Sequence, residues 1–428
     1  MDGYGDIGVG SGTGGRRGGF SPRNIRTFSS LKNPVYRLFY VGILGQNAGM
    51  NMQMFARTWL VARLTDSPRI AGFMGVAFAV PMICLSLFGG VMAERVQKKY
   101  VLIIGQVVSA MVSLGIAFSL SMGFMSPENP GSWWVLFVSG ILHGAVMALM
   151  MPSMQTLIPE IVGEEQLMNA ISLSNMGMNT LRIFAPAITG FLIGSVDYQG
   201  VYYVMAGMYM FSAIFISFLP RTRKTVPPVR RSQTGIREGF RYLRRETTIL
   251  IIVVLSLVAV VLSMPYQMLL PFLAKDVLNV GEAEGGTLMS ISGIGAIVSS
   301  IILASLPNKK RGLMMLIAGI ILGAALTSFS FSTLWPLSMG LMIFVGMGQA
   351  GNMTLGFTLL QYYSDEGYRG RVMSIMMMQF GLMGLGTLLA GQMAEQIGVQ
   401  WAIGGFAMAL AFLSVLAMVV LPRIRNLD

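Results

Sequence analysis

Long apolar runs follow one another along most of the chain, and short polar loops separate them. Each run is about 20 residues long, the length that a helix needs to cross the ~30 Å hydrocarbon core of a bilayer. The runs are continuous and do not alternate with polar residues, so they predict helices and not the strands of a membrane barrel. We expect twelve spans, near residues 36–63, 69–93, 100–124, 132–158, 167–195, 199–220, 248–274, 285–306, 312–332, 335–362, 371–395 and 399–421.

The 30 Lys and Arg residues are distributed unevenly between the loops. With the N-terminus inside, only Arg63, Arg69 and Lys275 fall in outward loops, and Arg57 and Arg182 lie well inside spans. This asymmetry follows the positive-inside rule and predicts a multi-pass membrane protein with both termini in the cytoplasm. The net charge of +12 then faces anionic lipid headgroups, so a nucleic-acid partner is not needed to explain it.

A basic segment divides the chain into two halves of six spans each. It runs from Arg221 to Glu246 and carries nine Lys or Arg. Within it, Ile236, Phe240 and Leu243 share one face and predict a short amphipathic helix on the inner membrane surface. The expected organisation is a flexible tail over 1–32, a helix bundle over 33–220, a basic linker over 221–247, a second bundle over 248–422 and a tail over 423–428.

The two halves resemble each other in sequence. The fifth span begins with NAISLSNMGMNTLRIFAPAITGFLIG and the eleventh with RVMSIMMMQFGLMGLGTLLAGQMAE, so that Ser172 corresponds to Ser374 and Gly190 to Gly391. Repeats of this kind are typical of secondary transporters, whose substrate sites lie near the membrane midplane between the repeats. The sequence therefore predicts an all-α membrane protein of two pseudo-symmetric six-helix bundles.

Several motifs resemble those of the major facilitator superfamily. GGVMAERVQKKYVL is similar to the family's signature loop between helices two and three, although Glu94 stands where Asp is usual and Gln97 where Gly is usual. WLVARLTDSP, QTLIPEIVGEEQLMNAISL and RGRVMS resemble the branch that contains bacterial enterobactin and macrolide exporters. The resemblance covers about residues 33–422. It implies the twelve-helix fold of the family, a location in the bacterial cell membrane and proton-coupled export of a small molecule.

The resemblance also implies a gating role for charged residues at the inner ends of the helices. In the family, an acid and bases of the signature loop pair across the two bundles in one state and separate in the other. A simple topology anchor would explain the lysines, but it would not explain Glu94, because acids contribute little to topology. The gating residues expected on this basis are Gly90, Glu94, Arg95, Lys98, Lys99, Arg369 and Arg371.

Polar residues on the fifth span indicate a cavity. Ser172, Asn175, Asn179, Arg182 and Pro186 are spaced three or four residues apart and share one narrow face. Hydrogen bonds between helices would explain the serine and asparagines alone. An arginine in the middle of a span is costly in lipid, so this face is expected to meet protein or water.

The first span repeats this pattern with Gln46, Asn51, Gln53 and Arg57, and we expect these residues to line the same cavity. Arg57 lies about two turns from the outer end, so its side chain could instead reach the outer interface.

The eleventh span places Met377 where the fifth span has polar groups. Methionine walls adapt to varied apolar ligands because the side chain is flexible and polarizable. A cavity with one cationic wall and one methionine wall suits a small amphipathic or anionic substrate, siderophore-like or drug-like. The planar fork of Arg182 suits carboxylate or catecholate oxygens in particular.

The residues leave two energy sources for transport open, a proton gradient and the membrane potential. None of the 18 acids lies deep inside a span, so the proton coupling that the resemblance implies would use an acid at a span end or His143. His143 is the single histidine and lies on the fourth span between Gly140 and Gly144, a pair that favours close helix packing. The alternative is an anionic substrate that the membrane potential drives outward without any proton.

Other classes of protein fit the sequence poorly. The chain has no P-loop and no HExxH, GxSxG or paired Cys/His pattern, so we expect neither an enzyme nor a bound metal or cofactor. Cys84 is the single cysteine, which excludes an intrachain disulfide. A transport-inactive receptor or scaffold of the same fold remains the main alternative. We expect a monomer.

Overall fold

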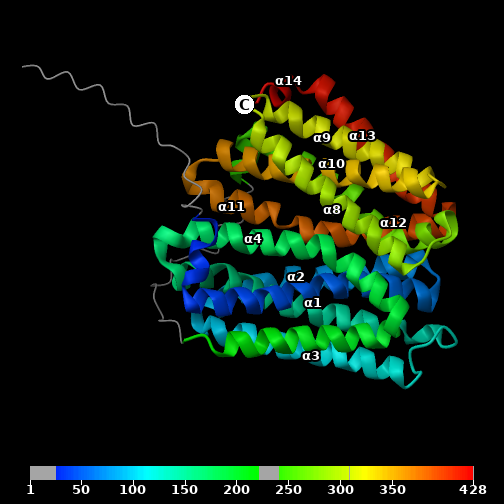
Figure 1. Ribbon diagram of the computed structural model, residues 1–428. Coiled ribbons are helices and arrows are strands. Elements are labelled where there is room, and N and C mark those ends of the chain that lie inside the picture. Colours follow the sequence, from blue (N-terminus) through cyan, green and yellow to red (C-terminus); the bar gives the residue numbers. More distant parts are fainter. Residues whose placement is uncertain (1–25, 221–240, 308, 428) are drawn as a thin grey trace, which may run out of the picture.

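Helices account for nearly all of the residues that the computed structural model describes, and no strand occurs among them. The described residues are 26–220, 241–307 and 309–427, apart from the side chains of residues 26–28, 86–95, 164 and 366. The long helices run side by side, with the connecting loops at the two ends of the molecule (Figure 1).

The N-terminal half contains one very long helical element, α4, that two backbone breaks divide into three segments. Gly163 and Asp197 interrupt it with positive φ values of 70° and 54°. The Asp197 carboxylate accepts a hydrogen bond from the Tyr198 N–H (2.8 Å) and pairs with Arg63 (2.6 Å), which stabilises the second break. The elements of this half are η2 (Arg26–Lys32), α1 (Pro34–Thr65), α2 (Pro68–Arg95), α3 (Lys98–Ser121), η3 (Pro130–Trp133) and α4 (Trp134–Ser217).

Two of the spans in the C-terminal half are also interrupted. Pro265 lacks an N–H, and it separates the first two helices of this half. Met377 and Met378 form the turn between α11 and α12. The elements are α6 (Thr247–Ser263), α7 (Pro265–Leu273), η4 (Ala274–Leu278), α8 (Glu282–Ser305), α9 (Arg311–Phe331), α10 (Trp335–Tyr363), α11 (Glu366–Met376), α12 (Gln379–Ile397), α13 (Val399–Val420) and α14 (Pro422–Arg425).

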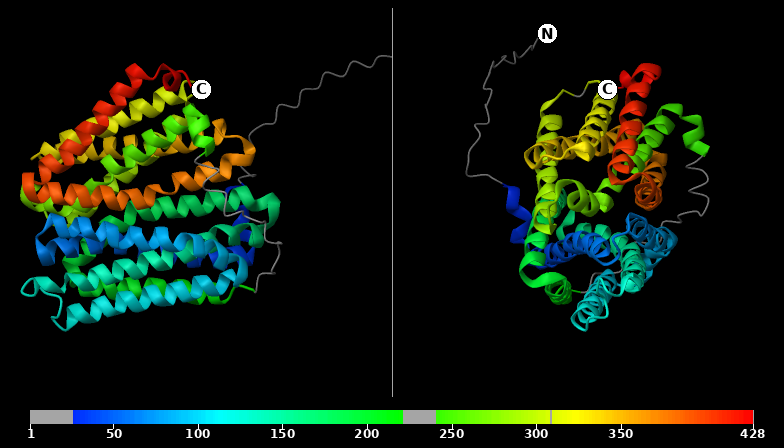
Figure 2. Two further views of the ribbon diagram at one scale, coloured as in Figure 1. Left: turned by 180° about the vertical axis from the view of Figure 1, so that it is seen from behind. Right: turned by 90° about the vertical axis from the view of Figure 1, so that its right-hand side faces the viewer.

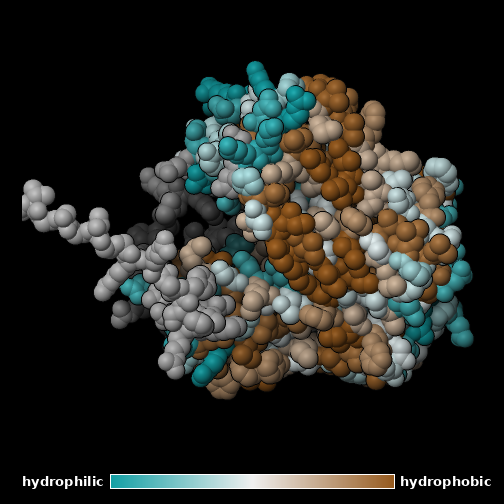
Figure 3. Space-filling model, turned by 45° about the horizontal axis from the view of Figure 1, so that its top comes forward, coloured by the Kyte–Doolittle hydropathy of each residue, from teal (hydrophilic) through white to brown (hydrophobic). Residues whose placement is uncertain are grey.

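Nine helical stretches of the described residues are long and apolar enough to cross a membrane. One of them, Glu165–Ser217, contains the break at Asp197 and corresponds to two predicted spans. α1 and α10 are long enough but carry more polar residues, and they are not among the nine. The described helices are therefore consistent with the twelve predicted spans. A broad apolar band lies between hydrophilic ends on the molecular surface (Figure 3).

The helices form the two predicted bundles. α1–α4 make the lower half of the molecule in Figure 1 and α6–α14 the upper half, and the end-on view in Figure 2 separates the same two groups. Contacts between the bundles run along two seams, one between α2 and α12 and the other between α4 and α8. The prediction of an all-α membrane fold with two helix bundles is confirmed.

The linker between the bundles lies largely outside the described residues, including Ile236 and Phe240. Its last part, residues 241–245, is helical. Leu243 is 2% exposed and packs into the core of the C-terminal bundle. The Tyr242 ring stacks on Tyr368 with the ring centroids 4.3 Å apart. Leu243 therefore packs on the C-terminal bundle, whereas most of the amphipathic helix that the sequence predicts lies outside the described residues.

Candidate functional site

The two bundles approach each other most closely near the end that carries Asp66, Asp197 and Gly398, which we call the outer end. Glycines make this approach possible. A Cβ on Gly72 of α2 would lie 2.7 Å from the Thr387 carbonyl oxygen of α12, and one on Gly286 of α8 would lie 2.4 Å from the Pro186 carbonyl oxygen of α4. Backbone therefore meets backbone along both seams, as small residues allow between membrane helices.

Polar contacts join the bundles at the outer end. Lys275 Nζ lies 2.7 Å from the Asp66 carboxylate. The Ser67 hydroxyl donates to Glu395 (3.1 Å). A third contact crosses the α4–α8 seam, where the Tyr198 hydroxyl donates to Glu282 (3.0 Å) and the Tyr198 side chain is 1% exposed. Together with the glycine seams, these contacts close the outer end.

The polar face of the fifth predicted span continues the α4–α8 seam toward the other end of the molecule. Pro186 and Gly190 on this face pack against α8. At 100° per residue, Asn179 and Arg182 lie on the same side of the helix as Pro186. Ser172, Asn175, Asn179 and Arg182 are all exposed, whereas Pro186 is buried. The exposed part of the stripe thus begins where the contacts of Pro186 and Gly190 with α8 end, and the charge of Arg182 acts on the Tyr266 phenol of the opposite bundle.

The second seam also continues toward the other end of the molecule. Gly384 and Gly381 of α12 pack against Ala79 and Ile83 of α2. Met377, one turn beyond Gly381 on the same face, is 39% exposed. Met377 and the polar stripe of α4 are therefore both exposed beyond the contacts that join the bundles along the two seams.

The predicted cavity residues of α1 lie elsewhere. Gln46 accepts a hydrogen bond from Gln106 of α3 (2.5 Å), and Gln53 accepts one from Tyr209 of α4 (2.7 Å). Both glutamines are buried inside the N-terminal bundle, as is Arg57 at 8% exposed. Asn51 is half-buried and donates to the Asn47 carbonyl within its own helix (2.8 Å). The face that was expected to line the cavity at Gln46, Gln53 and Arg57 is a packing face, because α3 and α4 cover it.

His143 also lies inside the N-terminal bundle. Its ring centroid is 6.0 Å from that of Phe78 and 6.4 Å from that of Tyr209. Gly144 of the neighbouring glycine pair allows close helix packing, as the sequence predicts, because a Cβ on it would lie 2.3 Å from the Phe78 carbonyl oxygen. His143 Nδ1 has no hydrogen-bond partner.

The expected gating residues are only partly described. The side chains of Gly90, Glu94 and Arg95 lie outside the described residues. Lys98 pairs with Glu160, and Lys99 Nζ donates to the Leu219 carbonyl (2.5 Å). Both lysine contacts stay within the N-terminal bundle, so neither lysine joins the two bundles in this state.

Arg369 and Arg371 lie at the inner end of the C-terminal bundle. Arg369 is exposed. The Arg371 guanidinium lies over the Tyr368 ring, 4.9 Å from its centroid, and Tyr368 stacks on Tyr242. Burial raises the pKa of the Tyr242 phenol, which keeps this phenol uncharged.

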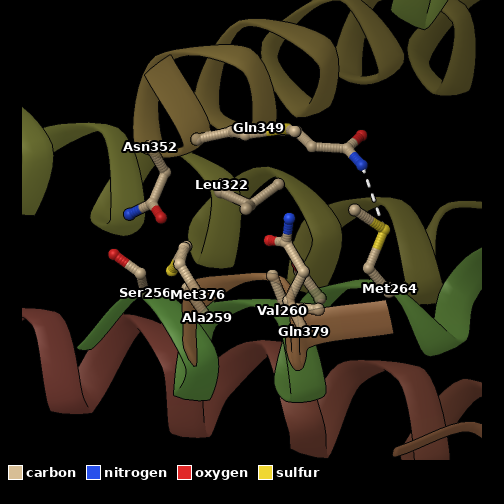
Figure 4. A pocket seen from close by; sticks show the side chains of 11 residues that line it. Ser256, Ala259, Val260, Met264, Leu322, Gln349, Asn352, Met376 and Gln379 are labelled. Atoms are coloured by element: carbon tan, nitrogen blue, oxygen red, sulfur yellow. Dashed lines mark hydrogen bonds between the residues drawn. The ribbon is translucent and has the colours of Figure 1, made fainter. Parts of the chain in front are cut away.

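A small pocket with several polar side chains in its largely apolar lining lies in the C-terminal bundle and was not anticipated from the sequence (Figure 4). Its lining includes Ser256, Gln349, Asn352 and Gln379, which come from α6, α10 and α12. The Gln349 amide donates to Met264 Sδ (3.2 Å), while Ser256 Oγ and Gln379 Nε2 are buried without a partner. Gln349 and Asn352 lie three residues apart on one face of α10, a spacing that could have marked it. The C-terminal half is therefore not purely apolar.

Metal-binding groups are scarce. No group of three or more His, Cys, Asp or Glu side chains in the described part of the chain could hold a metal ion. Cys84 is exposed and free.

Comparisons with known proteins agree with this architecture. The chain is 27% identical over 410 residues to the multidrug efflux pump Tap of Mycolicibacterium fortuitum, covering 94% of this chain and 98% of Tap. It is 24% identical over 391 residues to the enterobactin exporter EntS of Shigella boydii, covering 90% of this chain and 89% of EntS. Among solved structures, a mutant of the nucleoside transporter NupG has the same fold, with a TM-score of 0.73 and 15% identity, and the match covers 89% of this chain and 99% of NupG.

The sequence profile of the Major Facilitator Superfamily matches residues 39–385 and 308–426, which together span most of the chain. This match and the relatives agree with the motifs around Glu94 and Arg369. The chain belongs to the major facilitator superfamily of membrane transporters.

Proposed function

We propose that this protein is a secondary active transporter that exports a small amphipathic or anionic molecule by alternating access. The observation that carries the proposal is the exposed stripe of Ser172, Asn175, Asn179 and Arg182, which continues the seam that Pro186 closes at the outer end. A polar and cationic helix face is unfavourable in lipid, and contact with a substrate would explain why this helix carries one.

The closed outer end and the diverging inner end fit an inward-open state. The basic loops and both termini then face the cytoplasm and anionic lipid, as the charge asymmetry predicts. Substrate enters between α4 and α12 from the inside. Export requires the contacts of Asp66, Glu282 and Glu395 to break while contacts at the inner end form. Glu94 and Arg95 are the candidates for that inner closure, with Lys98, Lys99, Arg369 and Arg371 around them.

Arg182 is the residue that we assign to substrate charge. It is exposed in the opening and forms none of the ion pairs in the described part of the chain. Its guanidinium can bind a carboxylate or catecholate through two parallel hydrogen bonds. The names of the relatives, a multidrug efflux pump and an enterobactin exporter, support a substrate of this size and polarity.

Proton coupling is assigned to the carboxylates of the outer closure. Glu395 accepts from Ser67 and, at 3.4 Å, from the Arg69 N–H, and Glu282 accepts from Tyr198. A proton that arrives from outside would remove the negative charge that these donors bind, which favours opening of the outer end. His143 is the second candidate, and it lies deeper, between Phe78 and Tyr209.

Flux measurements in proteoliposomes test the function. A pH gradient and a membrane potential are imposed separately, with a labelled siderophore-like or drug-like anion as substrate. Transport that follows the pH gradient supports proton-coupled export. Transport that follows the potential alone would replace the proton with the alternative of potential-driven anion export, and binding without flux under either gradient would indicate a receptor or scaffold.

Two pairs of variants assign the roles. Glu395→Gln is expected to weaken the dependence of transport on external pH, whereas Glu284→Gln, on the exposed first turn of α8, is expected to leave it unchanged.

Arg182→Ala is expected to lower substrate affinity about tenfold or more, and Arg182→Lys to restore it only in part, because a point charge lacks the fork. Arg423→Ala removes the same charge from the exposed α14 and serves as control. Unchanged affinity in Arg182→Ala would contradict the assignment.

A further inference from the structure

Arg57 is the most deeply buried cation in the described part of the chain. It lies on α1 and is 8% exposed. Its guanidinium carbon is 5.9 Å from the centroid of the Phe78 ring on α2. A Cβ on Gly140 of α4 would lie 3.2 Å from its Nη1 atom, so the glycine lets α4 pack closely against the guanidinium. The side chain therefore ends inside the N-terminal bundle and does not reach the outer interface.

No carboxylate of the described residues pairs with this arginine. The ion pairs of these residues join Arg63 to Asp197, Lys98 to Glu160 and Lys275 to Asp66. The groups on which the Arg57 charge acts are instead the side chains of Tyr202, Tyr209 and His143. A guanidinium stays protonated in proteins, and an unpaired buried charge is strongly unfavourable. Arg57 thus lacks a counter-charge that its position requires.

Unused hydrogen-bond groups gather around the same arginine. Nε and Nη1 of Arg57, Nε2 of Gln53, the hydroxyl of Tyr202 and Nδ1 of His143 are all buried and have no partner. Gln53 belongs to the group because its Oε1 accepts from Tyr209, whose ring neighbours that of His143. Four of these five atoms carry a hydrogen to donate. Buried polar groups are normally satisfied, so this concentration of free donors needs an acceptor.

We propose that the N-terminal bundle holds a small inorganic anion, chloride under cellular conditions, at the Arg57 centre, which we define as Gln53, Arg57, His143 and Tyr202. Arg57 supplies the positive charge and two donors, Gln53 and Tyr202 supply one donor each, and the anion neutralises the arginine. A water molecule could accept some of these hydrogen bonds, but it would leave the charge uncompensated. The site is separate from the opening lined by Arg182 and does not depend on the identity of the transported substrate.

Thermal unfolding of the purified full-length protein in detergent tests the site. Unfolding is followed in potassium chloride and in potassium gluconate at equal ionic strength. Chloride is expected to raise the midpoint in a saturable manner, on the order of 5 °C at high occupancy. Bromide is expected to act like chloride, whereas sulfate, which is larger and carries two charges, is expected to act like gluconate.

Variants test whether the chloride-dependent shift of the unfolding midpoint requires Arg57. Arg57→Gln is expected to abolish the chloride-dependent shift. Arg63→Gln removes the same charge from an exposed position on the same helix and is expected to retain it. If Arg57→Gln does not fold, Tyr202→Phe removes a single hydroxyl and is expected to raise the chloride concentration at half-maximal shift several-fold.

Three results would overturn the proposal. One is an equal midpoint for the unmodified protein in chloride and gluconate. Another is a chloride shift that sulfate reproduces, which would identify a general salt effect. The third is a shift that Arg57→Gln, or Tyr202→Phe in its place, leaves unchanged.

Discussion

Closure of the outer end depends on a contact that a single methyl group would break. Gly286 of α8 lies against the backbone of α4, and a Cβ there would be 2.4 Å from the Pro186 carbonyl oxygen, 3.0 Å from its carbonyl carbon and 3.1 Å from Ala187 Cα. All three atoms are backbone, so none can turn aside as a side chain would. Gly286→Ala is therefore expected to force α4 and α8 apart at the outer end.

This substitution is expected to destabilise only the state in which the outer end is closed. Overpacking of a close contact typically costs about 1–3 kcal/mol. In a state where the bundles separate at the outer end, the added methyl group meets no partner helix and costs little. A differential of that size shifts the equilibrium toward the outward-open state by about 5- to 150-fold.

Thiol labelling from outside the cell measures this shift. Thr387 lies on the other seam and is 2% exposed, so a Thr387→Cys reporter in a Cys84→Ser background is protected while the outer end is closed. If the bundles rock as rigid bodies, the methyl group on the α4–α8 seam also uncovers the reporter on the α2–α12 seam. The labelling rate with an impermeant reagent is expected to rise with the open population.

The matched control is Gly115→Ala on α3, where a new Cβ would meet nothing within 4 Å. It is expected to leave the labelling rate unchanged. Equal rates in Gly286→Ala and Gly115→Ala, with both proteins folded, would refute the inference that this seam sets the outer closure.

Three further predictions concern gating, stability and topology. Glu94→Gln is expected to reduce transport strongly while surface expression stays nearly normal, because the carboxylate acts between states; normal transport would mark the loop as a topology anchor only. Tyr209→Phe leaves the buried Gln53 Oε1 without its donor, so the free energy of unfolding, measured at fixed chloride, is expected to fall by about 1–3 kcal/mol. Tyr203→Phe, at an exposed position, is its control and is expected to have little effect. A cysteine at Ser232 in the Cys84→Ser background is expected to resist labelling from outside intact cells, since the basic linker is assigned to the cytoplasm, and labelling there would contradict the topology.

Local sequence information was enough for the membrane fold. Apolar runs of span length predicted the helices because backbone groups in lipid must be satisfied within the segment itself. The same physics predicts that Arg182 meets protein or water, since the stripe from Ser172 to Arg182 is too polar for lipid and continues the face of Pro186. The two breaks in α4 also fall in loops that the hydrophobic pattern marked, near Gly163 and Asp197.

Periodicity also predicted a polar stripe on the first span, but in the structure other helices cover that stripe. A face of a helix is defined by its own sequence, whereas the neighbour that covers it is set by the packing of other helices. α3 and α4 cover Gln46 and Gln53 with Gln106 and Tyr209, partners that lie 60 and 156 residues away. The pocket of Ser256, Gln349 and Gln379 escaped notice for the same reason, because each helix contributes only one or two of its polar groups.

The sequence by itself determined that this chain spans the membrane and that its two halves resemble each other. It also determined which orientation in the membrane the charges favour. These properties follow from the transfer of each segment between water and lipid, which depends on composition along the chain. Only the tertiary structure decided which polar faces stay exposed and which meet another helix. It also showed that Arg57 lies in a bundle core, where none of the described carboxylates pairs with it. Such facts depend on contacts between distant residues, and no single segment carries that information.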